Sequence, residues 1–201
     1  MKLVKGEPKD AKDLKKIHVS AYQKCYRGYL PDDFLDSLSV SDDVVERTAR
    51  FIEANECYLI EVDNEKVAFV YLAYPKDRTD TFEIQAIYVH PDCQRKGVGR
   101  FFVNELAQMK KKEGFQKVIA WTIKEGPSIG FYEKTGFYQI EGENKFWRFD
   151  IPLVCFEKDN VQQYRNIFSL FSARELRRSR VDGILCRTGL HRWCNLRCVQ
   201  K

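Results

Sequence analysis

A short basic stretch, QRKGVGR at residues 94–100, combines two glycines with three cationic side chains. It follows an apolar run typical of a strand and precedes a run with helical periodicity. Glycine allows the backbone to approach a ligand closely, and the start of a helix presents unpaired N–H groups and the positive end of its dipole. The stretch therefore predicts a site for a phosphate-like anion, with a solvated strand-to-helix turn as the alternative.

Neither of two familiar glycine loops for phosphates fits this stretch. A Walker loop requires a Lys followed by Ser or Thr after its last glycine, and the chain has no such sequence. The dinucleotide fingerprint requires a third glycine after Gly97 and Gly99, and that position is Phe102. The site, if it binds an anion, belongs to a different class of fold.

The elements that position this turn follow from hydrophobic periodicity and turn residues. Asp10 is expected as the N-cap of the first helix, VDNE at residues 62–65 as a hairpin turn, and Gly136 as the residue that ends the last helix. Helical patterns cover residues 11–26, 32–39, 44–55, 100–113 and 127–136, and strand patterns cover 3–8, 57–62, 66–74, 81–91, 117–123 and, as a closing pair, 137–157. Because the central strands adjoin as hairpins, we expect an α/β (α+β) fold with a mixed, mostly antiparallel sheet and helices on both faces.

Two motifs around the glycine turn resemble those of the GCN5-related N-acetyltransferases. VHPDCQRKGVG, residues 89–99, is similar to the family's Q/R-x-x-G-x-G/A signature after a strand ending in V-x-P, and FYEKTGF, residues 131–137, is similar to its second landmark. YRGYLPDDFLDSL, near the N-terminus, is similar to a segment common among bacterial members. The resemblance covers residues 1–157 and implies the acyl-CoA N-acyltransferase fold.

The resemblance implies acetyl-CoA as cosubstrate and assigns its contacts. The backbone of Ile87, Tyr88 and Val89 would pair with the pantetheine arm, and the Val89 N–H would polarise the thioester carbonyl. The pyrophosphate would be held by the backbone of Arg95, Lys96, Gly97, Val98, Gly99 and Arg100. Glu125 stands where the family often has an Asn that binds pantetheine, and an ionised Glu cannot donate that hydrogen bond.

The resemblance also implies an acid and a base for acetyl transfer to an amine. Glu83, on the strand before the glycine turn, would be the general base, and Tyr132 the general acid beside the CoA sulfur. The alternatives are a polar strand residue for Glu83, sharing a face with Gln85, and a packing aromatic for Tyr132. His18 could face the acceptor, although a packed or surface histidine is the favoured interpretation.

The acceptor is expected over the first helices and the loop between them. Tyr22, Tyr26, Tyr29 and Phe34 supply aromatic rings there, and Asp32 and Asp33 supply acids, a combination suited to a cationic amine. Simple packing of a helix–turn–helix is the alternative. Small amines, antibiotics, amino acids and protein N-termini all stay open as acceptors.

Composition limits the other classes of function. The chain has 201 residues and seven cysteines without framework spacing, no apolar run long enough for a membrane span and no secretory-type N-terminus, so we expect a cytoplasmic protein with free thiols. We expect no metal site in the body, and a homodimer stays open. The function indicated is an acetyl-CoA-dependent N-acetyltransferase acting in a ternary complex on a primary amine of a small molecule, peptide or protein. A catalytically silent acyl-CoA-binding module of the same fold is the alternative.

The C-terminal part differs from the body in charge. Residues 158–201 carry ten Lys or Arg and three acidic residues, a net charge of +7, which leaves −2 of the chain's +5 for residues 1–157. We expect an acetyltransferase domain over 1–157 and a basic, poorly ordered extension over 158–201. The Cys and His residues of the extension are irregularly spaced, which argues against a zinc site. Nucleic-acid binding through the extension is a less favoured alternative.

Overall fold

The computed structural model describes residues 1–160, apart from the side chains of residues 142–144, and the expectations for the tail from residue 161 onward lie outside the described residues. Within this part of the chain, seven strands form one sheet in the order β1-β2-β3-β4-β5-β7-β6. Only β4 and β5 are parallel, so the mixed, mostly antiparallel sheet is confirmed. The strands are β1 (Lys2–Lys5), β2 (Cys57–Val62), β3 (Glu65–Ala73), β4 (Thr81–Val89), β5 (Lys117–Ile123), β6 (Tyr138–Phe146) and β7 (Pro152–Asp159).

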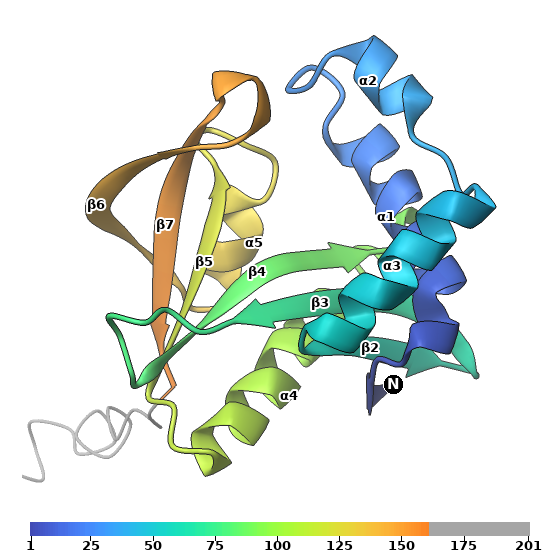
Figure 1. Ribbon diagram of the computed structural model, residues 1–201. Coiled ribbons are helices and arrows are strands. Elements are labelled where there is room, and N and C mark those ends of the chain that lie inside the picture. The colour runs from blue at the N-terminus through green and yellow to red at the C-terminus, as the bar shows by residue number, and fades with distance from the viewer. Residues whose placement is uncertain (161–201) are drawn as a thin grey trace, which may run out of the picture. The chain divides into compact units, whose positions relative to one another are not determined.

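Helices cover both faces of the sheet, as expected (Figure 1). The helices are α1 (Ala11–Cys25), α2 (Asp32–Ser37), α3 (Asp42–Ala54), α4 (Val98–Lys112) and α5 (Ile129–Lys134), with short 3-10 turns η1 (Pro8–Asp10), η2 (Pro91–Cys93) and η3 (Arg148–Asp150). β3 shows why its sequence is apolar almost throughout: Phe69 and Tyr71 pack with α1 and α3, whereas Val70 and Leu72 pack with α4. The chain thus builds one hydrophobic core on each side of the sheet.

Asp10 is the N-cap residue of α1, as expected, but its side chain makes no capping hydrogen bond to the helix. It lies at the end of η1, buried, where it accepts a hydrogen bond from the Glu7 N–H and pairs with Lys66 of β3. The acid was identified correctly as a structural residue, but its partner comes from a strand distant in the sequence. Its carboxylate therefore ties the entry of α1 to the sheet.

The sheet opens between β4 and β5. Their parallel pairing covers four residues on each strand and ends at Ile84 and Ala120, although β4 continues to Val89 and β5 to Ile123. At the same point β4 carries an extra residue relative to β3, because Leu72 pairs with Ile84 and Tyr71 with Ala86. Such a bulge increases the local twist, and β4 turns away from β5 beyond it (Figure 1).

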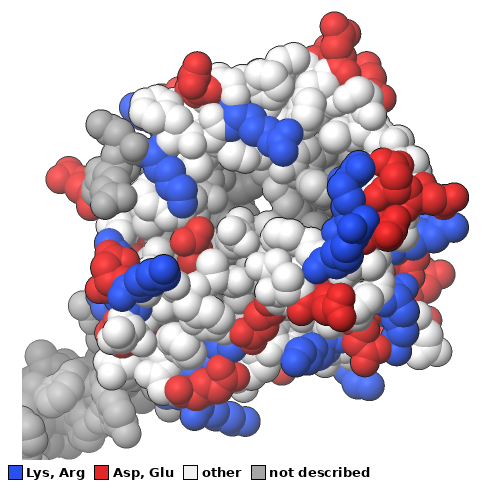
Figure 2. All heavy atoms as spheres, viewed as in Figure 1, with Lys and Arg blue, Asp and Glu red and all other residues white. Residues whose placement is uncertain are grey.

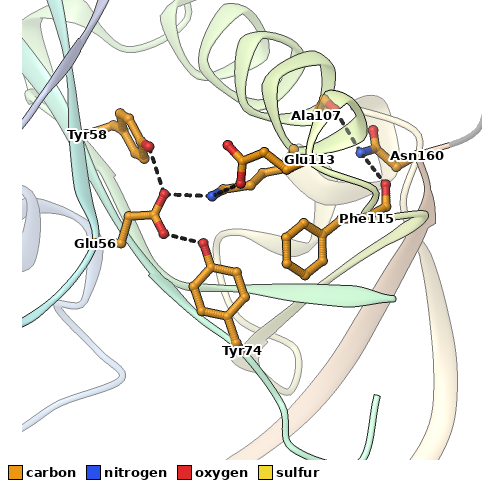
Figure 3. Close-up of polar contacts among 8 residues, drawn as sticks. Glu56, Tyr58, Tyr74, Ala107, Glu113, Phe115 and Asn160 are labelled. Atoms are coloured by element: carbon orange, nitrogen blue, oxygen red, sulfur yellow. Dashed lines mark hydrogen bonds and ion pairs between the residues drawn. The ribbon is translucent and has the colours of Figure 1, made fainter. Parts of the chain in front are cut away.

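A buried lysine, Lys110, ties the last turn of α4 to Glu56, the residue before β2 (Figure 3). Lys110 is 2% exposed, and its Nζ lies 2.6 Å from Glu56 and 2.8 Å from Glu113. Tyr58 and Tyr74 donate hydrogen bonds to the two oxygens of Glu56. Although burial acts in the opposite direction, the bonds from Lys110 and the tyrosines lower the pKa of Glu56, so the pair is charged at neutral pH.

Replacing Lys110 by methionine should destabilise the protein by about 2 kcal/mol. Removing one partner of a fully buried ion pair costs about 3–5 kcal/mol, and the figure here is smaller because both carboxylates reach water. Urea unfolding would measure the change, with Lys111→Met, at an exposed position in the same helical turn, as the matched control. Equal stability of Lys110→Met and the wild type would contradict this role.

Candidate active site

The glycine turn contains a row of backbone N–H groups that have no partner among the described residues. Gly97 is the N-cap of α4 in a left-handed conformation with φ of 84°, and Arg95 is also left-handed with φ of 61°. No described residue accepts a hydrogen bond from the N–H groups of residues 95–100; the first N–H that is bonded is that of Phe101, to the Gly97 carbonyl at 2.9 Å. The first turn of α4 contains no acid. These groups have the arrangement that the sequence predicts for an anion cradle, and anion binding by them stays a prediction.

The second glycine of the turn has a packing role. A side chain at Gly99 would place its Cβ 2.8 Å from the ring of Phe131, which is closer than such atoms approach. Phe131 and Tyr132 begin the motif of α5, so the absence of a side chain at Gly99 lets α5 pack directly on the head of α4. The two sequence motifs are therefore one packed unit.

The end of β4 directs free backbone groups into the opening beside β5. In an antiparallel pair, successive residues point their backbone groups alternately toward and away from the partner. His90 N donates to the Val67 carbonyl of β3 at 2.7 Å, so Val89 and Ile87 point away from β3. The Gln94 side chain bears this out, since its Nε2 reaches the Val89 carbonyl from outside the sheet at 3.1 Å.

This alternation divides the three residues for which the sequence predicts a cofactor contact. The backbone groups of Ile87 and Val89 face the opening, whereas those of Tyr88 face β3. The Tyr88 side chain packs on the α1 side of the sheet. In the sequence, Gln94 stands out only as the first residue of the glycine motif. In the structure, its side chain also fixes the Val89 peptide by a hydrogen bond to the carbonyl.

Tyr132 lies on α5, next to Phe131, and its side chain packs against β7. It is 4% exposed, its ring stacks on Phe156 at 5.6 Å, and burial raises the pKa of its hydroxyl, which stays protonated at neutral pH. Its hydroxyl makes no hydrogen bond to a described residue, and no fully buried side-chain oxygen among these residues lacks a partner. The small exposed part of Tyr132 therefore includes the hydroxyl, which is free to donate.

Glu83 faces the α1 side of β4. Its carboxylate is 17% exposed and lies 3.9 Å from the Nζ of Lys145, which in turn sits 4.7 Å from the centre of the Trp121 ring. The ion pair is long and reaches water, so the carboxylate retains lone pairs for a water or an amine. Its role as base stays a prediction.

Aromatic side chains gather over β4 from three separate segments. Tyr22 and Tyr26 of α1 lie 6.0 and 5.6 Å from Trp147, and Tyr22 lies 5.3 Å from Tyr88, whose hydroxyl donates to that of Tyr22 at 3.3 Å. Trp147 follows β6, and nothing in the sequence indicated that it would meet α1. Figure 2 shows that this face is hollowed between the α1–α2 side and the β6–β7 side.

The other two residues expected at the acceptor have different positions. Phe34 of α2 belongs to the same aromatic group and packs on Phe149 at 5.4 Å. The Tyr29 hydroxyl instead donates to the Glu125 carbonyl at 3.3 Å and joins the α1–α2 loop to the β5–α5 loop. Asp32, expected to attract a cationic amine, is paired with Arg27 at 3.0 Å.

Glu125 adopts a left-handed conformation with φ of 60°. The next residue, Gly126, could not carry a side chain, because its Cβ would lie 2.7 Å from that of Ile123. The loop is therefore a tight turn, and a left-handed glutamate in it is strained, since only Gly, Asn and Asp adopt this region readily.

The described part of the chain has neither a metal cluster nor a membrane span. No group of three or more His, Cys, Asp or Glu side chains there could hold a metal ion. No described helix combines the length and the apolar character needed to cross a bilayer.

The mixed sheet is opened between β4 and β5, and N–H groups without a described partner lie at the head of the helix that follows β4. Residues 12–137 match the model of the Acetyltransferase (GNAT) family, which is more than half of the chain. The chain belongs to this family, and the resemblance stated from its motifs is confirmed. It is an acyltransferase by that membership.

Relatives and solved structures agree with this family. The uncharacterized N-acetyltransferase YuaI of Bacillus subtilis (strain 168) is 27% identical over 139 residues, 67% of this chain and 79% of that protein. The PaiA N-acetyltransferase from Thermoplasma acidophilum, in complex with coenzyme A, has a TM-score of 0.60 at 16% identity and covers 79% of this chain and 98% of its own. YncA from Salmonella typhimurium, a putative acetyltransferase with its cofactor acetyl-CoA, has a TM-score of 0.59 at 17% identity and covers 81% and 95%. These structures show the fold.

His18 is packed within the aromatic group and should make stability pH-dependent. It lies 4.2 Å from Tyr22 and 5.3 Å from Tyr88, and its Nδ1 is 3.2 Å from the Lys15 Nζ. Burial, with the charges of Lys15 and Arg148, lowers the pKa of its imidazole to about 3. The unfolded chain therefore binds a proton at His18 that the folded chain does not between the ordinary value of about 6.5 and 3, so stability falls as the pH falls through this window.

Urea unfolding at pH 7 and pH 5 would measure this effect. The wild type should lose about 1–2 kcal/mol more than His18→Asn between these pH values, because the variant has no group that titrates there. An equal loss in both proteins would show that His18 is not the group responsible.

Proposed function

We propose that this protein transfers an acetyl group from acetyl-CoA to a primary amine by direct attack in a ternary complex. The observation that carries the proposal is the opening between β4 and β5, whose free backbone groups lead to the row of unpaired N–H groups at residues 95–100. An extended pantetheine arm can pair with the free backbone groups of β4, and a pyrophosphate can bind the N–H groups of residues 95–100. Relatives with bound coenzyme A or acetyl-CoA support the same ligand.

Each step of the reaction has a candidate group. The Val89 N–H, directed into the opening, stabilises the oxyanion of the tetrahedral intermediate, and one such donor contributes about 3 kcal/mol. Glu83, directly or through a water, takes the proton that the amine must lose. As the carbon–sulfur bond breaks, the Tyr132 hydroxyl donates its proton or a hydrogen bond to the thiolate.

Tyr132→Phe tests the acid. Turnover, measured as CoA-thiol release, should fall about 10²-fold, within the range for general acid catalysis, because the thiolate loses its donor. The dissociation constant of acetyl-CoA should change less than threefold, since the ring still packs on Phe156. Tyr138→Phe is the matched control and should retain activity, since it removes from β6 a hydroxyl that bonds to Glu157 of β7.

Acetyl-CoA should raise the melting temperature of the wild type and of Tyr132→Phe alike. A rise without CoA-thiol release from any amine would indicate the silent acyl-CoA-binding module instead. An unchanged melting temperature would contradict the donor site itself.

Glu125→Asn should improve both stability and cofactor affinity. Asparagine tolerates the left-handed conformation of this position and offers an amide donor to pantetheine, which glutamate lacks. Glu125→Gly is the matched control, because it relieves the same strain without a donor. The melting temperature should rise by a similar amount in both variants. Only Glu125→Asn should tighten acetyl-CoA binding, by about 3- to 10-fold for one net hydrogen bond. Equal affinities in the two variants would mean that this side chain does not reach the cofactor.

A further inference from the structure

The acceptor side of the site contains cations that have no acidic partner among the described residues. Arg148, at the start of η3, and Lys15, on α1, form no ion pair with any of these residues. Asp32 and Asp36 of α2 are both engaged by Arg27. Asp13 of α1 pairs with Lys16, and Glu83 is shared with Lys145, which leaves exposed Asp33 and Asp150 as the acids of these segments without an ion pair to a described residue. Of the two acids expected to attract a cationic amine, Asp32 is thus paired and Asp33 is not.

Arg148 is held in place by a strained turn. Trp147 N donates to the Ile151 carbonyl at 2.8 Å, and Phe149 and Asp150 both have positive φ, 57° and 55°. Two successive left-handed residues that are not glycine cost energy and persist only where the surroundings enforce them. Here Trp147 and Ile151 are anchored in the apolar cluster of α1 and α2, and the turn projects Arg148 between them.

The guanidinium of Arg148 is positioned by aromatic contact. Its Cζ lies 5.6 Å from the centre of the Phe34 ring, and Phe149 packs on the same ring at 5.4 Å. An arginine stacked on a ring keeps its N–H groups free at the edge of its plane, where they match the two oxygens of a carboxylate or phosphate. No described residue accepts these N–H groups, and the side chain is exposed.

The charge of Arg148 is directed toward α1. Burial is the main cause that lowers the pKa values of Lys15 and His18, and the charge of Arg148 adds to it, after that of Arg47 for Lys15 and after that of Lys15 for His18. Lys15 in turn lies 3.2 Å from His18, which is uncharged at neutral pH. A substrate that carries an anion beside its ammonium group gains a favourable interaction with Arg148 and Lys15 that a simple amine lacks.

We propose that the acceptor is a primary amine that also carries an oxyanion group, a carboxylate or a phosphate, and that Arg148 binds this group with Lys15 as a second cation. This inference rests on the proposed acetyl transfer. The amine enters the aromatic hollow over β4 toward Glu83, and the oxyanion stays at its rim. Arg148 is then a specificity residue, since it binds the acceptor away from the reacting atoms.

The test compares acceptors in pairs that differ in the anion alone. Leucine is compared with leucinamide and with isoamylamine, phenylalanine with phenethylamine, and O-phosphoethanolamine with ethanolamine, by CoA-thiol release under kcat/KM conditions. At least one oxyanion member should exceed its partner by about 10- to 100-fold, the range for hydrogen bonds to a charged group. The leucine and phenylalanine comparisons test for recognition of a carboxylate, and the O-phosphoethanolamine comparison tests for recognition of a phosphate.

The variants assign this preference to Arg148. Because the amines of a pair differ in intrinsic reactivity, the decisive quantity is the change of the ratio between pair members on mutation, in which this difference cancels. Arg148→Met should lower the ratio about 10-fold or more, and Arg148→Lys should restore part of it by keeping the charge without the planar fork. Arg50→Met, on an exposed residue of α3 paired with Glu46 at 3.2 Å, should leave the ratio unchanged.

Four other results would overturn the inference, and they differ in whether acetyl transfer and the donor site are rejected with it. Preference for the neutral member of every pair, or a ratio that Arg148→Met does not change, rejects the oxyanion site while acetyl transfer stands. No release from any acceptor, in a protein whose melting temperature acetyl-CoA raises, rejects the inference and acetyl transfer together but retains the donor site. No rise in melting temperature rejects the donor site as well.

Discussion

The loss of pairing between β4 and β5 after Ile84 and Ala120 is the constraint on which the site depends. A strand inside a sheet normally has both rows of backbone groups bonded, and unpaired buried groups are costly. Here the bulge opposite Tyr71 and Leu72 turns β4 away, so Ile87 and Val89 keep one row free. The cost is reduced because Gln94 already satisfies the Val89 carbonyl. Under the proposed function, the pantetheine arm of acetyl-CoA would complete this part of the sheet.

Under the proposed function, the two sides of the site would recognise their ligands by different means. At the head of α4 the ligand-facing groups are backbone N–H groups, positioned by Gly97 and by the packing of Phe131 on Gly99, so their geometry depends on the chain path. On the acceptor side the groups are side chains from α1, α2 and the segment around η3. A donor site made of backbone and an acceptor site made of side chains would allow an exposed residue of the acceptor side, such as Arg148, to change while the donor site stays the same.

The parts of this structure that local physics determines were predictable from the sequence. The hairpin at Asp63 and Asn64, both with positive φ, the left-handed Gly136 after α5 and the glycine turn all follow from residues within a few positions. Contacts between distant segments were not predictable in this way. Asp10 pairs with Lys66, Trp147 meets Tyr22, and Arg148 lies on Phe34, and in each case the partner is fixed only when the sheet is assembled. The bulge in β4 belongs to the same group, since only register against β3 reveals it.

The regular, well-packed scaffold holds strained residues in place in the loops around the site. Of the described residues other than glycine with positive φ, Asp63 and Asn64 form a hairpin turn, and the other four, Arg95, Glu125, Phe149 and Asp150, all lie in loops around the site. Each such conformation costs about 1–3 kcal/mol, a notable share of the stability of a domain. That strain can persist only if the surrounding packing resists relaxation, which the two-sided core and the Lys110 cluster provide. Stability in the sheet and helices therefore maintains loop geometry that the loops would not adopt alone, and a change in the Lys110 cluster would reach the site through the position of α4 and its glycine turn.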